Sequence, residues 1–217
     1  MKYKSGFVTI IGNPNVGKST LFNNLLDYEL SIVTSKSQTT RDSIKGIITT
    51  DNYQIVLSDT PGHVEASYML HSKMNKNIFS SLEGSDLIIY VTDIYEKIVN
   101  NRLIEAVKKL SIPMYFLVNK KDQLKEKEYL PSVEYSTFSD YDMVSADDKD
   151  DCKMILKKIV SYLPIHSPYY LNDDLTNKSE RFIVSEIIRK EIFELYKKEV
   201  PYSTHIETES FKNEEKL

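Results

Sequence analysis

Short apolar runs alternate with amphipathic stretches through the first 163 residues of the chain. The apolar runs, which are rich in β-branched residues, lie at 7–11, 43–50, 54–58, 86–92, 113–119 and about 141–145. The stretches with helical character lie at 18–26, 67–82, 100–110 and about 150–163. This alternation predicts an α/β fold with a mostly parallel sheet and helices on both of its faces.

Two details refine the predicted sheet. Residues 51–53 alone separate the second and third apolar runs, which predicts a hairpin that adds one antiparallel strand. The runs at 86–91 and 113–118 show no alternation of polar and apolar residues. Such runs are typical of central strands that are buried on both faces.

The remaining residues follow a different pattern. Residues 164–178 contain two prolines and show no periodicity, so we expect a linker there. Ser179 is a suitable N-cap for a helix whose apolar residues recur at helical spacing over 182–195, and we expect Pro201 to end it. A strand is expected to begin at Thr204. The predicted organisation is a domain over 1–163, a linker over 164–178 and a shorter segment over 179–217.

The sequence GNPNVGKS lies directly after the first predicted strand and opens the first predicted helix. It matches the pattern G-x-x-x-x-G-K-S, in which glycines let backbone N–H groups surround a phosphate at a helix N-terminus. We expect Lys18 to reach the β- and γ-phosphates and the Ser19 hydroxyl to bind Mg²⁺. The residues predicted to bind nucleotide here are Gly12, Asn13, Pro14, Asn15, Val16, Gly17, Lys18, Ser19 and Thr20.

A second turn with candidate chemistry, DTPG, follows the predicted strand at 54–58. The pattern D-x-x-G is a common turn, but its position after a strand, about forty residues beyond Lys18, favours a metal and γ-phosphate site. We expect Asp59 to hold a water molecule of Mg²⁺ and Gly62 to present its N–H to the γ-phosphate. The predicted binding residues in this turn are Asp59, Thr60, Pro61 and Gly62.

The polar loop SKSQTTRDS lies between the first predicted helix and the second strand. A threonine hydroxyl in such a loop completes the Mg²⁺ shell while the γ-phosphate is present and releases it after hydrolysis. We favour Thr40 over Thr39 for this role because Thr40 directly precedes Arg41; the alternative is a solvated connection. The predicted metal ligands are therefore Ser19, Thr40 and Asp59, and the predicted switch loops cover 27–43 and 60–80.

The turn NKKD ends the apolar run at 113–118 and is a candidate site for base selection. Asp122 is expected to accept hydrogen bonds from guanine N1–H and the exocyclic amine, which would select guanine over adenine by roughly 10⁴ or more. We expect the stem of Lys120 to cover the base and Asn119 to tie this turn to the phosphate loop. NKKD alone is an ordinary polar turn, but three motifs at strand ends along one edge of a sheet favour a GTP site. In the following VSA sequence, Ser145 and Ala146 are predicted to contact guanine, with the Ala146 N–H directed at O6.

Composition narrows the class of protein. The 217 residues carry a net charge of −4, which gives no support for nucleic-acid binding through bulk charge, and we expect no DNA partner. Cys152 is the single cysteine, which excludes an intramolecular disulfide framework and favours a reducing, cytoplasmic compartment. The longest purely apolar run, at 87–91, is too short to span a bilayer.

The motifs GNPNVGKS, QTTRDS, DTPG, NKKD and VSA, with SERFIVSEIIRKEIFELYKKEVPYS after the linker, resemble the Era family of bacterial ribosome-assembly GTPases. The resemblance runs from about Phe7 to the C-terminus. It implies a Ras-like P-loop GTPase domain that binds GTP or GDP with Mg²⁺. It also implies binding to small-subunit ribosomal RNA through a C-terminal KH domain and, in some members, peripheral association with the inner membrane.

The chain departs from the KH pattern in its last segment. A KH domain holds nucleic acid through a G-x-x-G loop, but no glycine follows Gly84. Residues 168–217 carry eight Lys and Arg against eleven Asp and Glu. We therefore expect an incomplete KH-like segment, either because the chain is a truncated product or because a reduced version has lost direct contact with RNA.

Hydrolysis is expected to proceed by in-line attack of water on the γ-phosphorus, with Lys18, Thr40 and Gly62 as catalytic groups beside Mg²⁺. The sequence offers no evident internal arginine finger, so we expect slow turnover without an activator, on the order of 10⁻⁴ to 10⁻² per second. His63 is a fourth catalytic candidate because it follows DTPG and could position the water; the alternative is a loop residue that points elsewhere. The predicted function is a GTP-hydrolysing switch, and the alternative is a non-catalytic nucleotide-sensing module that docks on a ribosomal or membrane partner.

Overall fold

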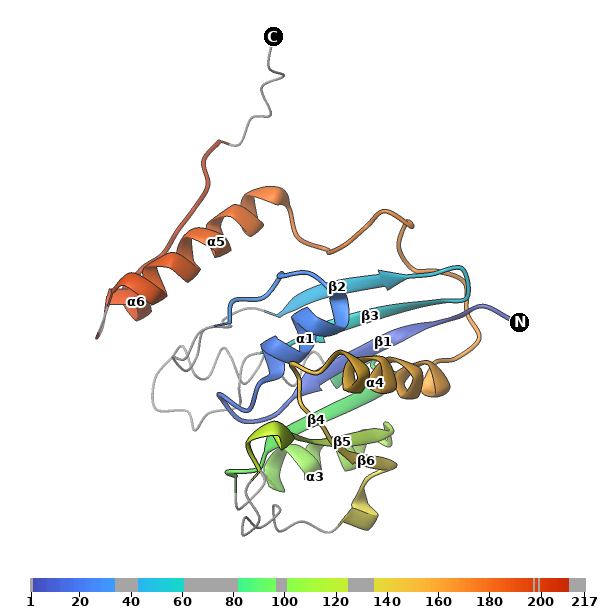
Figure 1. The fold of residues 1–217 in the computed structure, drawn as a ribbon. Coiled ribbons are helices and arrows are strands. Elements are labelled where there is room, and N and C mark those ends of the chain that lie inside the picture. The colour runs from blue at the N-terminus through green and yellow to red at the C-terminus, as the bar shows by residue number, and fades with distance from the viewer. Residues whose placement is uncertain are drawn as a thin grey trace.

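A six-stranded sheet forms the centre of the structure (Figure 1). The computed structural model describes residues 2–33, 43–60, 82–96, 101–124, 135–196, 198 and 200–210. The strands are β1 (Lys4–Ile11), β2 (Ile44–Thr49), β3 (Tyr53–Asp59), β4 (Leu87–Asp93), β5 (Met114–Asn119) and β6 (Asp140–Met143). Their spatial order is β2-β3-β1-β4-β5-β6, and every neighbouring pair is parallel except β2 and β3. The predicted fold class and the predicted antiparallel hairpin are therefore confirmed.

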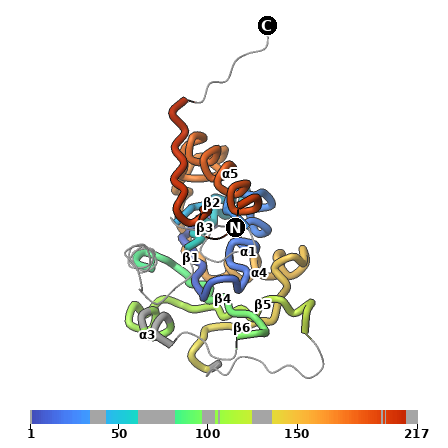
Figure 2. Tube along the Cα trace, turned by 90° about the vertical axis from the view of Figure 1, so that its left-hand side faces the viewer, coloured from blue at the N-terminus to red at the C-terminus, as the bar shows by residue number. Residues whose placement is uncertain are grey.

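Helices cover both faces of this sheet, as predicted. The described helices are α1 (Lys18–Leu26), α3 (Asn101–Leu110), α4 (Lys149–Tyr162), α5 (Glu180–Leu195) and α6 (Val200–Ser203), with 3-10 turns η1 (Lys121–Gln123) and η2 (Tyr135–Thr137). Figure 2 shows α1 and α4 on one side of the sheet and α3 on the other. None of the described helices has both the length and the apolar character needed to cross a membrane. The helix predicted at 67–82 lies outside the described residues except for its last position.

Two apolar cores form on opposite faces of the central strands. Alternate side chains of a strand point to opposite faces of the sheet. Ile89 and Leu117 therefore join the core beneath α1 and α4, while Ile88 and Phe116 join the core beneath α3. Burial on both faces explains why β4 and β5 read as continuous apolar runs in the sequence.

The parallel strands bring their carboxyl ends to one edge of the sheet. Ile10 lies opposite Asp59 in the register of β1 and β3, and Asp93 lies opposite Asn119 in that of β4 and β5. The three motif turns follow or end these strands. The fold thus gathers at one edge turns that are about one hundred residues apart along the chain.

Residues 164–178 pack along the sheet. Gln54, which is fully buried, accepts hydrogen bonds from the N–H groups of Tyr169 and Tyr170 at 2.7 and 3.0 Å and donates to the Tyr170 carbonyl oxygen at 3.0 Å. Further on, the Leu175 carbonyl oxygen accepts a hydrogen bond from the Tyr28 hydroxyl at 2.6 Å. The predicted linker therefore has fixed contacts with both β3 and the end of α1.

The end of the helix after the linker differs from the prediction. Ser179 caps α5 as expected, since its side chain accepts from the Phe182 N–H, but α5 ends at Leu195 rather than at Pro201. Tyr196 leaves the helix with an extended backbone, and Pro201 falls inside the short helix α6. A proline is tolerated in a first helical turn, where its missing N–H is not needed.

The strand expected from Thr204 is also not formed. Residues 204–210 run extended beside α5 (Figure 2), and the Thr208 hydroxyl lies 2.7 Å from the Ser185 hydroxyl. They form no strand because no described residue pairs with their backbone in a ladder. An extended backbone is therefore present without the partner that would make it a strand.

Candidate functional site

The loop between β1 and α1 is shaped by two glycines. Gly12 has φ +147° and Gly17 has φ +95°, conformations that other residues rarely adopt. A Cβ on Gly12 would lie 2.0 Å from the carbonyl oxygen of Val91, and one on Gly17 would lie 2.2 Å from Asn119 Nδ2. The close approach of β4 and β5 to this loop therefore requires glycine at both positions.

Lys18 begins α1 and is almost completely buried, with 6% of its surface exposed. Its Nζ donates to the Asn13 carbonyl oxygen at 2.7 Å, so the side chain curls back over the loop. Burial lowers the pKa of this lysine to about 8, and the nearby carboxylates of Asp59 and Glu96 only partly offset the effect. A group that brings negative charge to this loop would thus be favoured electrostatically.

Ser19, in the first turn of α1, contacts Asp59 at the end of β3. The Ser19 hydroxyl donates to Asp59 Oδ2 at 2.7 Å, and the Ser31 hydroxyl donates to the same oxygen at 2.6 Å. Asp59 is fully buried. A hydroxyl and a carboxylate are oxygen donors of the kind that Mg²⁺ prefers, so these residues fit the expected ion. The sequence analysis missed Ser31, for which no motif gave a signal.

The described residues offer no all-protein metal cage. Among them, no group of three or more His, Cys, Asp and Glu side chains is placed to hold a metal ion. Mg²⁺ usually keeps several waters and is bound through one or two carboxylates together with phosphate oxygens. Ser19 and Asp59 would supply one hydroxyl and one carboxylate to an ion that is held in this way.

Part of the predicted site falls outside the described residues. These predictions concern Thr40, Pro61, Gly62 and His63. Thr60 is described and fully buried, and its hydroxyl donates to the Ile10 carbonyl oxygen at 2.7 Å. This bond fastens the beginning of the DTPG turn to β1.

Asn119 joins three loops, and its side chain is buried. Its Nδ2 donates to the Val16 carbonyl oxygen at 2.9 Å, which confirms the predicted tie between the NKKD turn and the phosphate loop. Its Oδ1 accepts from the Ala146 N–H at 2.8 Å. The N–H that we expected to meet guanine O6 is thus donated to Asn119 in this structure, so a base would have to share it or displace that bond.

Lys120 lies across the same edge. Its Nζ is 2.5 Å from Asp93 Oδ2 and 2.9 Å from the Asn15 carbonyl oxygen, and it lies 5.7 Å from the centre of the Tyr95 ring. Asp122, two residues further on, is exposed in η1. Lys120 and the exposed Asp122 therefore belong to a turn at the edge that also carries the phosphate loop.

Two acidic residues, Asp93 at the end of β4 and Glu96 just beyond it, lie near the phosphate loop. Glu96 accepts hydrogen bonds from Asn13 Nδ2 and from the Thr92 hydroxyl, and Asp93 accepts from Lys120. The sequence analysis missed both. The sequence did carry a signal for them, because Asp93 ends a central strand and Glu96 lies three residues beyond it, at the edge of the sheet where the site is.

Cys152 lies beneath the VSA turn, and its thiol donates to the Ala146 carbonyl oxygen at 3.4 Å. Burial, with the neighbouring carboxylates of Asp151, Asp148 and Asp147, raises its pKa from 9.0 to about 11. Because the reactive thiolate is scarce below this pKa, we expect the folded protein to resist a thiol reagent at pH 8. The protonated thiol also stabilises the folded state below pH 9, and we expect this contribution to the free energy of unfolding to be lost as the pH rises from 9 to 11. Labelling before and after unfolding in guanidinium, and denaturant titrations over this pH range, test both points. Rapid stoichiometric labelling of the folded protein would contradict the first.

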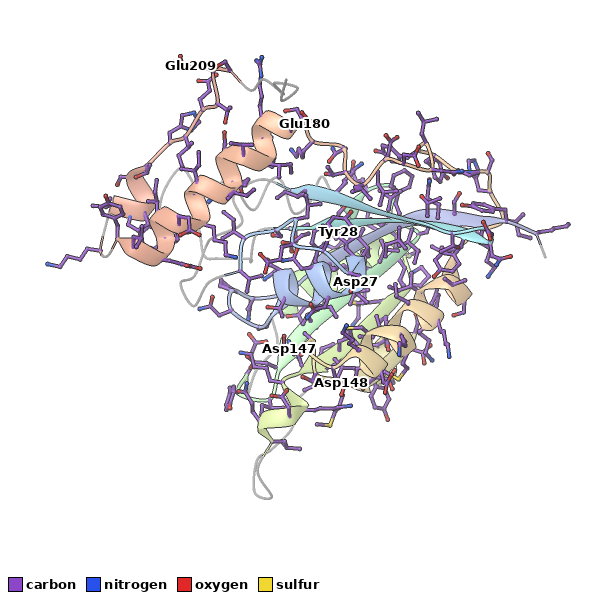
Figure 3. The ribbon with its side chains drawn as sticks, turned by 45° about the horizontal axis from the view of Figure 1, so that its top comes forward. Asp27, Tyr28, Asp147, Asp148, Glu180 and Glu209 are labelled. Carbon is purple, nitrogen blue, oxygen red and sulfur yellow. The ribbon has the colours of Figure 1, made fainter. Side chains whose placement is uncertain are left out.

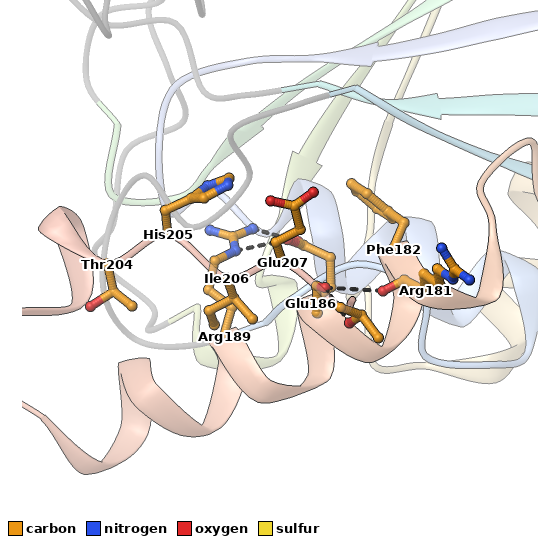
Figure 4. Close-up of a pocket in the computed structure, with 10 residues that line it drawn as sticks. Arg181, Phe182, Glu186, Arg189, Thr204, His205, Ile206 and Glu207 are labelled. Atoms are coloured by element: carbon orange, nitrogen blue, oxygen red, sulfur yellow. Dashed lines mark hydrogen bonds and ion pairs between the residues drawn. The ribbon is translucent and has the colours of Figure 1, made fainter. Parts of the chain in front are cut away.

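A groove of about 470 Å³ lies between α5 and the extended residues 204–208. In Figure 4, Glu186 and Arg189 pair with each other on its α5 side, opposite His205 and Glu207. None of the predicted nucleotide-binding residues lines this groove. The expected site is instead the open edge formed by the motif turns.

Comparisons with known proteins agree with this arrangement. The family described as 50S ribosome-binding GTPases matches residues 7–120. GTPase Era of Lactobacillus delbrueckii subsp. bulgaricus is 38% identical over 210 residues, covering 94% of this chain and 70% of that protein. GTPase Era of Clostridium kluyveri is 38% identical over 219 residues, covering 98% of this chain and 75% of that protein.

Two solved structures share the fold over nearly the whole chain. Era in complex with MgGDPNP and nucleotides 1506–1542 of 16S ribosomal RNA superposes with a TM-score of 0.81 at 31% identity, over 93% of this chain and 70% of that one. A variant of Aquifex aeolicus Era bound to GDP·AlF4⁻ also gives a TM-score of 0.81, at 32% identity over 92% of this chain and 70% of that one. Both of these similar structures were solved with a bound guanine nucleotide.

Proposed function

The chain belongs to the Era family of GTPases, and from this premise we propose that it is a GTP-hydrolysing switch that acts on the small ribosomal subunit during assembly. Its relatives are named GTPases, which supports the catalytic function over the non-catalytic nucleotide-sensing module.

One observation carries the assignment of the site. Asn119 hydrogen-bonds to both the phosphate loop, through the Val16 carbonyl oxygen, and the VSA turn, through the Ala146 N–H. A phosphate site and a base site must lie within the length of one nucleotide to hold the same molecule. These two bonds, from a single buried side chain, give that proximity to turns that lie far apart in sequence.

The proposed roles follow from the positions of the side chains. Residues 12–20, Lys18 among them, would hold the phosphates. Ser19 would bind Mg²⁺ directly, and Asp59 would hold it through a water molecule. The ion would supply charge neutralisation and orientation at the β- and γ-phosphates. Asp122 would accept the two donors on the edge of guanine.

The ribosomal partner is inferred from relatives. Era has been solved with a segment of 16S ribosomal RNA, which supports the small subunit as the partner of the switch. We propose no direct contact with RNA through residues 168–217, because these residues carry eleven Asp and Glu against eight Lys and Arg and contain no G-x-x-G loop. A cytoplasmic location with peripheral contact at the inner membrane remains a prediction from the resemblance.

The test combines nucleotide binding with turnover. Calorimetry should show binding of GTP and GDP in Mg²⁺ and about 10⁴-fold weaker binding of ATP. GTP hydrolysis should be slow alone, should fall when EDTA removes Mg²⁺ and should return when the ion is restored. Addition of purified 30S subunits should stimulate hydrolysis, with 50S subunits as the matched control.

Different outcomes contradict different parts of the proposal. Equal affinity for ATP and GTP would contradict the guanine site. A lack of stimulation by 30S subunits, or equal stimulation by 50S subunits, would contradict the proposed partner while leaving the GTPase activity intact.

A further inference from the structure

Asp151 lies in the first turn of α4, and 9% of its surface is exposed. Its Oδ2 accepts a hydrogen bond from the Ser145 N–H at 2.7 Å, and its Oδ1 lies 2.6 Å from Lys121 Nζ. Ser145 follows β6 and Lys121 follows β5. One buried carboxylate therefore joins the turns that follow two neighbouring strands.

Each of the two residues that Asp151 contacts is the direct sequence neighbour of a residue expected to recognise guanine. Lys121 precedes Asp122 in η1, and Ser145 precedes Ala146. The Lys121 N–H also donates to the Val144 carbonyl oxygen at 3.1 Å, so the two turns already touch through their backbones. Charge-assisted hydrogen bonds fix direction as well as distance, so the carboxylate sets how the two turns face each other.

A simpler role for Asp151 would be to stabilise the start of α4. That role is filled by Asp148, whose side chain accepts from the N–H groups of Asp150 and Asp151 at the helix start (Figure 3). Asp150 carries the same charge in the same turn, yet it pairs with Lys153 at 2.9 Å, and its side chain is 90% exposed. The contacts with Ser145 and Lys121 therefore distinguish Asp151 from its neighbour, and Asp150 offers a matched control.

We propose that Asp151 is a positioning residue for guanine selection, holding Asp122 and Ala146 at the spacing that the base requires. This inference rests on the proposed function, because it assumes that these turns bind guanine. Loss of the Asp151 carboxylate should weaken recognition of the base more than binding of the phosphates.

The preference for GDP over IDP measures base recognition, because IDP lacks only the exocyclic amine that Asp122 is expected to bind. Calorimetry with the full chain in Mg²⁺ should give a preference of about 10-fold or more for the unmodified protein. Asp151→Ala and Lys121→Met should each lower this preference by at least about threefold. Asp151→Asn keeps an acceptor for the Ser145 N–H and should lower it less than Asp151→Ala, while Asp150→Asn should leave it unchanged.

The outcomes separate this inference from the proposed function. If Asp151→Ala and Lys121→Met weaken GDP and IDP equally, the carboxylate has a purely structural role and the inference is wrong. If the unmodified protein binds GDP and IDP equally, the guanine site itself is wrong. Should circular dichroism show that Asp151→Ala does not fold, an unchanged preference in both Lys121→Met and Asp151→Asn would still overturn the inference.

Discussion

Replacing Lys18 with methionine is expected to lower the rate of GTP hydrolysis at least about 100-fold. The side chain is buried and bonded to the Asn13 carbonyl oxygen, so its ammonium is already held at the phosphate loop. Methionine keeps much of the length but removes the charge that would neutralise the transferring phosphoryl group. Single-turnover hydrolysis with protein in excess over GTP measures the effect on the chemical step.

Stability and a matched variant control for this experiment. Burial lowers the pKa of Lys18, which means that the folded state is penalised for holding the charge. Lys18→Met should therefore be at least as stable as the unmodified protein in a thermal unfolding experiment without nucleotide. Lys153→Met, which changes an exposed lysine in α4, should hydrolyse GTP within about twofold of the unmodified rate, since exposed ion pairs contribute little. Hydrolysis by Lys18→Met at a near-normal rate would contradict the proposed role.

The sheet could be predicted from the sequence because its signals are local. The continuous apolar runs of β4 and β5 and the short connection between β2 and β3 each report on one or two adjacent elements. The edge at which the motifs gather followed from parallel pairing alone, since carboxyl ends of parallel strands meet. The bond of Asn119 to the phosphate loop could be predicted from the sequence because both of its ends lie in recognisable motifs.

Other contacts could not be predicted because they join residues that no motif relates. Glu96 reaches Asn13 across 83 positions, and Asp151 reaches Lys121 across 30. Such pairs depend on the depth at which a helix or loop packs against the sheet, and one sequence does not encode that depth in a readable pattern. Both acceptors are nevertheless carboxylates near a strand end or a helix start at the site, which is where further polar groups could be sought.

The two errors in the last segment have a common physical origin. Pro201 was expected to end the helix because a proline cannot continue it. In the structure α5 ends six residues earlier, at Leu195, because the backbone of Tyr196 is extended. Likewise, the alternating residues after Thr204 favour an extended chain, but a strand also needs a partner. Local preference gave the backbone conformation, and tertiary contacts decided where each element ended or whether it formed.

Replacing Asp122 with asparagine is expected to lower the affinity for GDP by about 10³-fold or more and to create affinity for XDP. The carboxylate offers two acceptors to the N1–H and exocyclic amine of guanine, whereas an amide offers one acceptor and one donor. Xanthine keeps the N1–H but carries a carbonyl oxygen in place of the amine, so it complements the amide. Calorimetric titration of GDP and XDP against both proteins measures the exchange of preference.

The gain of XDP binding is the informative part of this experiment, because an unfolded or distorted site loses affinity for every nucleotide. Asp147→Asn is the matched control, since Asp147 is exposed directly after Ala146 and its carboxylate lies 3.4 Å from Asn24 Nδ2. It should keep the preference for GDP. If Asp122→Asn binds neither nucleotide, or binds GDP as before, the base is not read by this carboxylate and the guanine site must be sought elsewhere on the same edge of the sheet.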